Sequence, residues 1–316
     1  DYQCFKNMTN VGLKVFAPAS VANVACGYDV LGLALEKPGD EIYVRFSNNP
    51  GFRITKITGG KLPYEPEKNT AGFAALKMLE HLEETGRGIE MEIHKKMPFG
   101  SGLGSSAASA AGAVMAINEL LGRPLTKREM LPFAVQGEQV ADGAYHADNV
   151  APSLLGGFVL IRDNETLDVH RLPAIKGLQI AIVHPKIEIL TKYSRSVLSD
   201  QVSLKQMIKQ TGSVGGLVTA MFKGDLELLQ RSLQDVVIEP QRAQLIPGFY
   251  KVQEAAINAG ALGCSISGAG PSIFAICPNN FVAENAGVAM QEVFKNINIS
   301  STIFLSGINH EGAVLI

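Results

Sequence analysis

Short runs of apolar residues predict β-strands at intervals along the chain. Each run is rich in β-branched or aromatic residues and ends in polar or glycine-containing segments. The predicted strands are Leu13–Phe16, Glu41–Phe46, Ile89–His94, Phe158–Arg162, Leu178–His184, Ile273–Cys277 and Thr302–Leu305. Longer stretches between them carry apolar residues three or four positions apart, which is the spacing of one helix face.

The sequence Thr126-Lys127-Arg128-Glu129 is a capping box and predicts a helix that runs to about Ala141. The other predicted helices are Ala71–Glu84, Ser105–Leu121, Ser203–Phe222, Asp225–Asp235, Phe249–Ala259 and Val282–Phe294. Strands and helices do not alternate strictly. We therefore expect an α+β fold rather than a doubly wound parallel sheet.

A chain of 316 residues suits two domains. The polar stretch 162–168, followed by Pro173, is the candidate boundary. The prediction is thus one domain over residues 1–172 and a second over 173–316.

Three glycines at alternate positions, Gly100, Gly102 and Gly104, lead directly into the alanine-rich helix predicted from Ser105. Glycine allows a positive φ and close approach to an anion, and the start of a helix offers unpaired N–H groups. The segment has neither the lysine of the Walker pattern nor the spacing of the dinucleotide fingerprint. It is either a phosphate cradle or a flexible turn before a tightly packed helix.

Composition narrows the class of protein. The 28 basic and 30 acidic side chains nearly cancel, so no overall field would attract nucleic acid or an anionic membrane. The longest apolar stretch, Ala107–Ile117, falls far short of the roughly 20 residues that span a bilayer. Residues 1–7 lack the features of a secretion signal. The cysteines, with no metal-binding spacing, predict reduced thiols in a cytoplasmic protein: Cys4, Cys26, Cys264 and Cys277.

Three segments together resemble the GHMP small-molecule kinases, and most of all their branch that phosphorylates the amino acid homoserine. The first segment is Ala17–Asn23 continuing through Gly27–Gly32, the second is Pro98–Ala108, and the third is Ser267–Ser272. They occur in the family's order, and the resemblance covers nearly the whole chain. Residues 24–28 depart from the Leu-Gly-Pro-Gly-Phe that this branch more often carries.

The resemblance implies an N-terminal domain like domain 2 of ribosomal protein S5, a ferredoxin-like C-terminal domain, and an active site between them. It also implies ATP and Mg²⁺ as cofactors. The nucleotide contacts that it implies are Asn69, Pro98, Gly100, Ser101, Gly102, Leu103, Gly104, Ser105, Ser106, Gly268 and Gly270. Asn69 taken alone is also typical of a helix N-cap, and both roles can hold.

Ser106 and Glu138 match the family's Mg²⁺ ligands, and hydroxyl and carboxylate oxygens are what this ion prefers. Glu138 lies in a stretch more apolar than a solvated helix face, so we expect it to be buried.

The resemblance further implies L-homoserine as the phosphoryl acceptor. Asn23 and Asp29 match the residues that accept its ammonium group, and Arg195 and Arg242 match those that bind its carboxylate. The contacts near its hydroxyl fall within the run His146-Ala147-Asp148-Asn149. Here His146 and Asn149 match substrate contacts, and with Asp148 they are the candidate catalytic residues. A histidine and an aspartate this close are also typical of a metal or acid–base pair, whereas the resemblance implies transfer without a base.

Other functions stay open. The chain lacks the G-R-x-N-L-I-G-E-H stretch of galactokinases and the A-P-G-K stretch of mevalonate kinases, but another GHMP kinase with a different alcohol substrate is an alternative. A non-catalytic relative is a second alternative, although it would be expected to lack Ser106, Glu138 or the Asp148–Asn149 pair. An oxidoreductase would need a dinucleotide fingerprint that is missing. The family also implies a homodimer, with no nucleic-acid or membrane partner.

Overall fold

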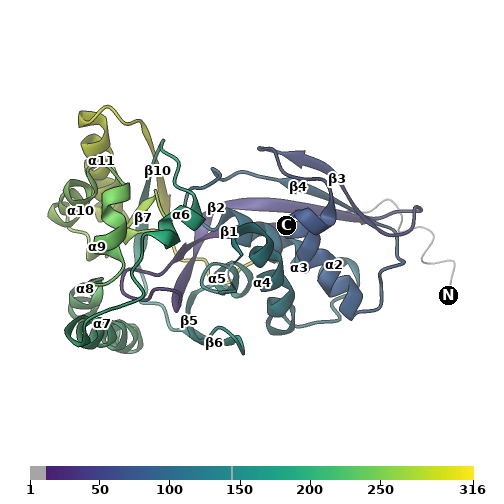
Figure 1. Cartoon of the computed structure of the whole chain (residues 1–316), viewed down its shortest axis with the longest axis horizontal. Helices are drawn as coiled ribbons and strands as arrows, with labels where there is room; N and C mark the ends of the chain where they lie inside the picture. The colour runs from purple at the N-terminus through teal and green to yellow at the C-terminus, as the bar shows by residue number, and fades with distance from the viewer. Residues whose placement is uncertain (1–11, 144) are drawn as a thin grey trace.

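The computed structural model describes residues 12–143 and 145–316, so Cys4 lies outside the described residues. The described strands form two sheets, one of seven strands and one of four. The molecule is elongated, with the larger sheet and its helices at one end and the smaller sheet at the other (Figure 1). The predicted α+β class is confirmed.

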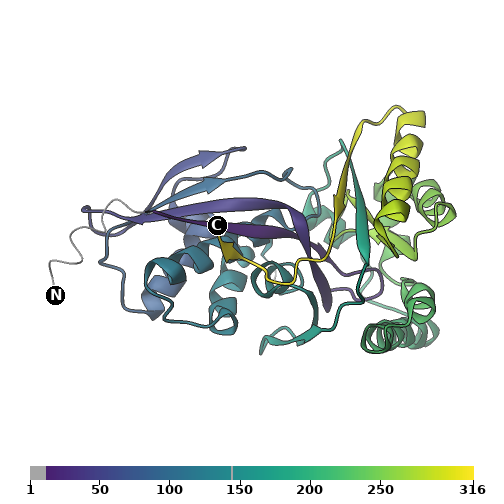
Figure 2. The same cartoon turned by 180° about the vertical axis from the view of Figure 1, so that it is seen from behind.

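The larger sheet has the order β11-β1-β2-β4-β3, and β5 pairs with both β2 and β6. All these pairs are antiparallel except β3 with β4. The strands are β1 (Leu13–Ala22), β2 (Leu31–Phe46), β3 (Phe52–Thr58), β4 (Ile89–His94), β5 (Phe158–Asp163), β6 (Asp168–Leu172) and β11 (Val314–Leu315). Figure 2 shows the C-terminal segment running back along this sheet to β11.

Helices cover one face of the larger sheet (Figure 1). They are α2 (Thr70–His81), which follows the short 3₁₀ turn η1 (Pro66–Lys68), then α3 (Ser105–Leu120), α4 (Lys127–Asp142) and α5 (Val150–Leu155). Helix α3 is buried on most sides, and its small residues let it lie close to the strands. A Cβ at Gly112 would lie 2.7 Å from Cγ1 of Ile42, so only glycine permits this approach.

The smaller sheet is antiparallel, with the order β10-β7-β9-β8. Its strands are β7 (Gln179–Pro185), β8 (Gly263–Ile266), β9 (Ile273–Cys277) and β10 (Ser301–Ser306). Numbered along the chain this is the 4-1-3-2 order of a ferredoxin-like fold. The remaining elements are α6 (Thr191–Ser196), α7 (Leu204–Lys223), α8 (Leu226–Ser232), α9 (Glu239–Arg242), η2 (Ala243–Leu245), α10 (Phe249–Asn258) and α11 (Asn280–Asn296).

Every predicted strand and helix is present, with ends that shift by a few residues or, for β1 and β2, extend further. The sequence reading missed β3, β6, β8 and β11 and the short helices α5, α6 and α9. The capping box at Thr126 is confirmed, because its side chain and that of Glu129 bond each other's backbone N–H.

The polar stretch 162–168 is not a linker. It turns the chain between β5 and β6 inside the larger sheet. The chain passes to the smaller sheet after β6, but β11 returns to pair with β1. The division of the chain into two domains at residue 172 therefore stays a prediction. It would assign β11 to the second domain, although this strand lies in the larger sheet. No helix in the described part of the chain is both long and apolar enough to cross a bilayer.

Candidate active site

A cavity of about 180 Å³ opens where the two parts of the molecule meet. The structure brings most of the predicted site residues to its wall, from both parts of the chain. Four predicted nucleotide contacts do not line it: Asn69, Pro98, Leu103 and Gly270. The wall residues are Asn23, Tyr28, Asp29, Phe99, Gly100, Ser101, Gly102, Gly104, Ser105, Ser106, Glu138, His146, Asp148, Asn149, Thr191, Arg195, Arg242, Gly268 and Ala269.

The glycine loop has the left-handed backbone that its sequence predicts, with φ of 76° at Gly102 and 65° at Gly104. It lies directly on the third segment. Ser267 donates a hydrogen bond through Oγ to the Gly102 carbonyl (2.7 Å), and a Cβ at Gly102 would come within 2.3 Å of the Ser267 carbonyl. The third segment thus supports the loop, and Gly102 is required by this contact as well as by its φ.

Hydrogen bonds also join the first segment to the other two. The Ser20 amide donates to the Leu103 carbonyl (3.0 Å), and Asn23 Nδ2 donates to the Gly268 carbonyl (3.1 Å). Leu103 turns its side chain into the core, where it is fully buried. The three segments, far apart in sequence, therefore form one connected site.

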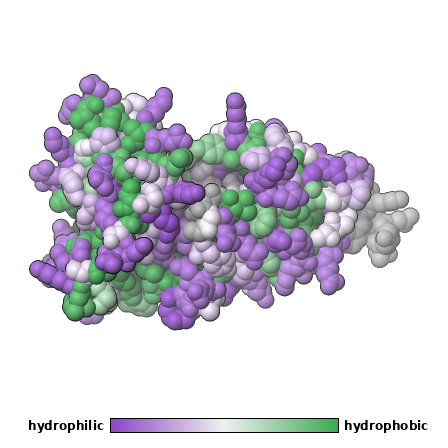
Figure 3. Space-filling view, viewed as in Figure 1, coloured by the Kyte–Doolittle hydropathy of each residue, from purple (hydrophilic) through white to green (hydrophobic). Residues whose placement is uncertain are grey.

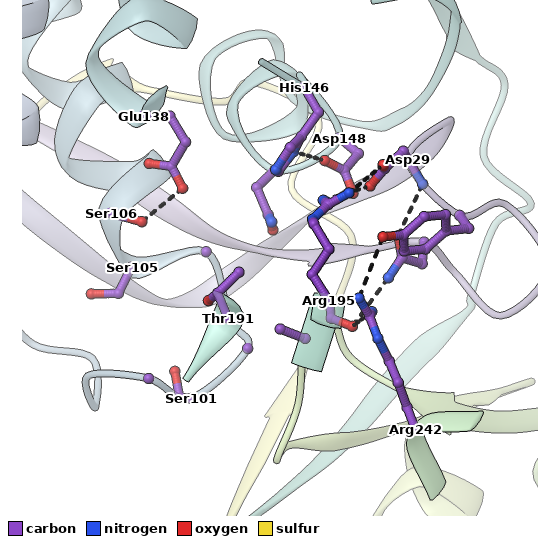
Figure 4. A pocket seen from close by; sticks show the side chains of 18 of the residues that line it. Asp29, Ser101, Ser105, Ser106, Glu138, His146, Asp148, Thr191, Arg195 and Arg242 are labelled. Atoms are coloured by element: carbon purple, nitrogen blue, oxygen red, sulfur yellow. Dashed lines mark hydrogen bonds and ion pairs between the residues drawn. The ribbon is translucent and has the colours of Figure 1, made fainter. Parts of the chain in front are cut away.

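Helix α3 begins at the end of the glycine loop and places Ser106 in its first turn. Ser106 Oγ donates a 2.7 Å hydrogen bond to Oε1 of Glu138 on α4 (Figure 4). Glu138 is 5% exposed, so the expectation that it is buried is confirmed. A hydroxyl and a carboxylate side by side, next to a helix N-terminus, are an oxygen ligand pair that fits Mg²⁺.

A buried ion pair beneath the loop was not predicted. The side chains of Lys95 and Asp40 are 1% and 0% exposed and contact each other. Lys95 Nζ also donates to the Ser105 carbonyl (2.6 Å) and to Ser109 Oγ (2.7 Å), both on α3. Burial lowers the pKa of Lys95, while the charges of Asp40 and Glu138 act in the opposite direction. The alternation of Ile89, Met91 and Ile93 on the buried face, continued by two residues, was the sequence signal that separates Lys95 from the exposed Lys96 beside it.

The His146–Asn149 run faces the cavity. The Asp148 carboxylate accepts a hydrogen bond from Nδ1 of His146 at 2.6 Å, and both residues are buried. Asn149 Oδ1 accepts from Ser20 Oγ at 2.8 Å, which fixes this side chain against the first segment. Asp29 lies beside His146 and Asp148, and ligand atoms of the three lie within 4.8 Å of one another. Because Asp29 already holds the cationic Arg195, this group is poorly suited to a metal ion.

Arg195 on α6 forms a two-pronged ion pair with Asp29, with N–O distances of 2.9 and 3.1 Å (Figure 4). Burial disfavours the charge of this guanidinium, but the hydrogen bonds and charge of Asp29 outweigh burial and raise its pKa. The two residues predicted for opposite ends of an amino acid thus contact each other.

Arg242 on α9 is only 4% exposed and has no carboxylate partner among the described residues. It donates to the carbonyls of Ser194 (3.1 Å) and Gly268 (3.0 Å). Burial lowers the pKa of Arg242, and the nearby charge of Arg195 acts in the same direction. A buried cation of this kind favours an anion in the cavity.

The backbone of the first segment is strained. Three consecutive residues without the freedom of glycine have positive φ: 69° at Asn23, 41° at Val24 and 62° at Ala25. Such conformations cost on the order of 1–3 kcal/mol each and cluster at functional sites. Asn23 Oδ1 accepts from the Asp29 amide at 3.1 Å, which closes this loop on itself. This backbone conformation places Asn23 and Asp29 on the same wall of the cavity.

Asn69 caps helix α2. Its Oδ1 accepts from the amides of Ala71 (3.0 Å) and Gly72 (3.2 Å), and its Nδ2 donates to the Pro63 carbonyl (2.8 Å). The N-cap interpretation is confirmed. Its contact with a purine stays a prediction.

Comparisons with known proteins agree with this geometry. The family model of the GHMP kinases N terminal domain matches residues 69–157, and that of the GHMP kinases C terminal matches residues 217–296. The homoserine kinase of Chlorobium phaeobacteroides is 48% identical over 95% of this chain and 98% of its own length. That of Xylella fastidiosa is 40% identical over 96% of this chain and 94% of its own.

Solved structures show the same likeness. The crystal structure of homoserine kinase from Cytophaga hutchinsonii has a TM-score of 0.94 and 51% identity, over 96% of this chain and 97% of that one. Lactococcus lactis galactokinase complexed with galactose has a TM-score of 0.72 at 16% identity, over 99% of this chain and 98% of that one, which shows a shared fold alone. With both family models matched in order and relatives this similar over nearly its whole length, the chain belongs to the GHMP kinases, in their homoserine kinase branch.

Proposed function

We propose that this protein transfers the terminal phosphoryl group of ATP to the side-chain hydroxyl of L-homoserine, giving O-phospho-L-homoserine for threonine synthesis. The activity named for its relatives supports this reaction. The observation that supports an amino acid as the substrate is the state of Arg242. This arginine is a buried cation without a carboxylate partner in the described residues, and it lies on the same wall as Asp29 and Arg195.

The cavity offers charges of both signs at one place. Arg195 and Arg242 would bind a carboxylate, and Asp29, with Asn23 beside it, would accept an ammonium group. Guanidinium groups suit carboxylates because their donors form a planar fork. A sugar or mevalonate carries no ammonium group to replace Arg195 as the partner of Asp29. An α-amino acid has both charges in the required proximity.

The residues at the other end of the cavity fit a nucleotide with its metal ion. The amides at the start of α3 and in the glycine loop would hold phosphate oxygens. Ser106 and Glu138 would hold Mg²⁺, which when bound neutralises charge on the transferred group. His146 and Asn149 would orient the acceptor hydroxyl between the two ends.

We propose further that no side chain acts as a general base. Each cavity carboxylate already has a partner: Asp29 has Arg195, Asp148 has His146, and Glu138 has Ser106. Positioning and electrostatics dominate phosphoryl transfer, so a base is not required. We therefore expect Asp148→Asn to lower kcat by less than about tenfold, since loss of a true base costs about 10²–10⁴. A larger loss would overturn transfer without a base, with Asp148 either taking the proton itself or orienting His146 to take it.

Release of ADP tests the reaction directly. Homoserine, mevalonate, galactose and shikimate should be compared at equal concentrations with ATP and magnesium. Faster turnover of a non-amino-acid alcohol would favour another GHMP kinase activity, and no turnover with any of them would favour a non-catalytic relative. The homodimer implied by the family and the cytoplasmic location predicted from the cysteines stay predictions, and sedimentation would measure the first.

Replacing Arg242 tests the substrate assignment. Arg242→Leu should raise the KM for homoserine by about 10- to 100-fold, because a charge-assisted hydrogen bond is lost. The KM for ATP should change much less. Arg231→Leu, which removes an exposed arginine on α8, is the control. An unchanged KM for homoserine in Arg242→Leu would remove this arginine from the substrate site.

A further inference from the structure

Tyr28 lies against both arginines of the substrate site. The guanidinium carbon of Arg195 is 5.4 Å from the centre of its ring, and that of Arg242 is 5.1 Å from it. The Tyr28 hydroxyl is 3.4 Å from Nη2 of Arg242, which donates toward it. One aromatic side chain thus contacts two cations that come from separate helices, α6 and α9.

These two cations repel each other. Asp29 offsets the charge of Arg195 through two hydrogen bonds, whereas the hydrogen bonds of Arg242 within the described residues go to two carbonyl oxygens and the Tyr28 hydroxyl. The face of an aromatic ring carries negative potential and attracts cations within about 6 Å, most strongly where water is excluded. A ring that contacts both groups lowers the cost of keeping them together.

Tyr28 lies between two hollows of the molecule. Tyr28 lines the active-site cavity and also an apolar groove, which Met207 and Val214 of α7 and Ile238 line as well. The left-handed Asp29 (φ 56°) follows it directly in the chain. The ring turns about only two side-chain bonds, whereas both arginine side chains are long and have more rotatable bonds, so less conformational entropy is lost when the ring is ordered than when an arginine is.

We propose that Tyr28 is a positioning residue that holds Arg195 and Arg242 together as a two-cation clamp for the carboxylate of the amino-acid substrate. This inference rests on the proposed function. The ring face, rather than the hydroxyl, supplies most of the effect, because the hydroxyl contact is long. Tyr28 acts on binding of the amino acid and not on the phosphoryl transfer, since it touches neither Ser106 nor Glu138.

Steady-state kinetics of Tyr28→Leu and Tyr28→Phe test the proposal. Tyr28→Leu should raise the KM for homoserine by about tenfold, with kcat and the KM for ATP changed by less than about threefold, because two cation–π contacts are lost. Tyr28→Phe keeps the ring and should stay within about threefold of wild type in all three constants. Phe46→Leu removes a remote ring that contacts Arg87 at 5.5 Å and is the matched control.

A substrate analogue separates positioning from general loosening of the site. The amide of homoserine lacks the carboxylate charge, so it should lose less affinity in Tyr28→Leu than homoserine does. Equal losses for both, or a fall in kcat with no change in KM, would overturn the clamp. If Tyr28→Leu leaves the KM for homoserine unchanged while Arg242→Leu raises it, the clamp is wrong and the proposed function stands. If the wild-type protein does not phosphorylate homoserine, the proposed function fails.

Discussion

The side chains at the two ends of the cavity suit different ligands. Ser106 and Glu138 lie at the end proposed to hold phosphate, and Asp29, Arg195 and Arg242 at the other (Figure 4). The ion pair of Asp29 with Arg195 means that these residues satisfy each other until a ligand enters. A ligand with only one charge would leave one of them without a partner, which is costly at a partly buried site. A zwitterion avoids that cost.

Glu138→Gln tests the metal-binding role at the residue scale. The amide oxygen can still accept the hydrogen bond from Ser106, so the fold should be retained. We expect kcat to fall by about 100-fold or more, because a neutral side chain would bind Mg²⁺ weakly and the ion would no longer neutralise the charge of the transferred phosphoryl group. The magnesium concentration for half-maximal activity should rise.

Glu80→Gln is the control for this change, because Glu80 has a side chain that is 52% exposed and forms an ion pair with Lys77. Kinetics over a magnesium titration measure both variants. Near-normal turnover of Glu138→Gln with unchanged magnesium dependence would remove Glu138 from the site.

At the scale of elements, helix α3 depends on a buried ion pair for its position. Asp40 is on β2, and Lys95 follows β4 and reaches the first turns of α3 through Ser105 and Ser109. Asp40 Oδ1 also accepts from the Lys96 amide at 2.7 Å. The pair thus fixes two strands, the entry to the glycine loop and the helix N-terminus relative to one another.

Lys95→Met should therefore destabilise the protein far more than Lys96→Met. Removing Lys95 leaves Asp40 buried and uncompensated, which costs about 3–5 kcal/mol of unfolding free energy. Lys96 is 53% exposed in its pair with Glu41, and such a pair contributes about 0–1 kcal/mol. Urea denaturation of both variants provides the comparison, and equal losses would contradict a positioning role for the buried pair.

At the scale of the whole molecule, the candidate active site depends on how the part with the larger sheet packs against the part with the smaller sheet. Residues from both parts of the chain line the cavity. The last strand, β11, pairs with β1 in the larger sheet, so the chain crosses between the two parts twice. This double connection holds the two parts on either side of the cavity.

The surface differs between the two ends. Figure 3 shows green apolar patches over the end that carries the smaller sheet. Large apolar side chains exposed there come from α7, α10 and α11, and they are Leu204, Ile208, Phe222, Tyr250, Phe281 and Val288. Cys26, Cys264 and Cys277 are all free and buried.

The sequence by itself determined the local structure. Apolar spacing located the main strands and helices, the capping box located the start of α4, and the glycine loop predicted left-handed turns at Gly102 and Gly104. These features follow from backbone hydrogen bonds and steric limits within a few residues. The family resemblance then identified most of the cavity wall, because its motifs carry the result of tertiary contacts made in related proteins.

Only the tertiary structure decided which distant side chains meet. Asp29 and Arg195 are 166 positions apart, and Lys95 and Asp40 are 55 apart. The place of Tyr28 against two arginines and the return of β11 to β1 are of the same kind. Such contacts depend on how complete sheets and helices pack, because burial and charge act through space and leave no periodic signal in the chain.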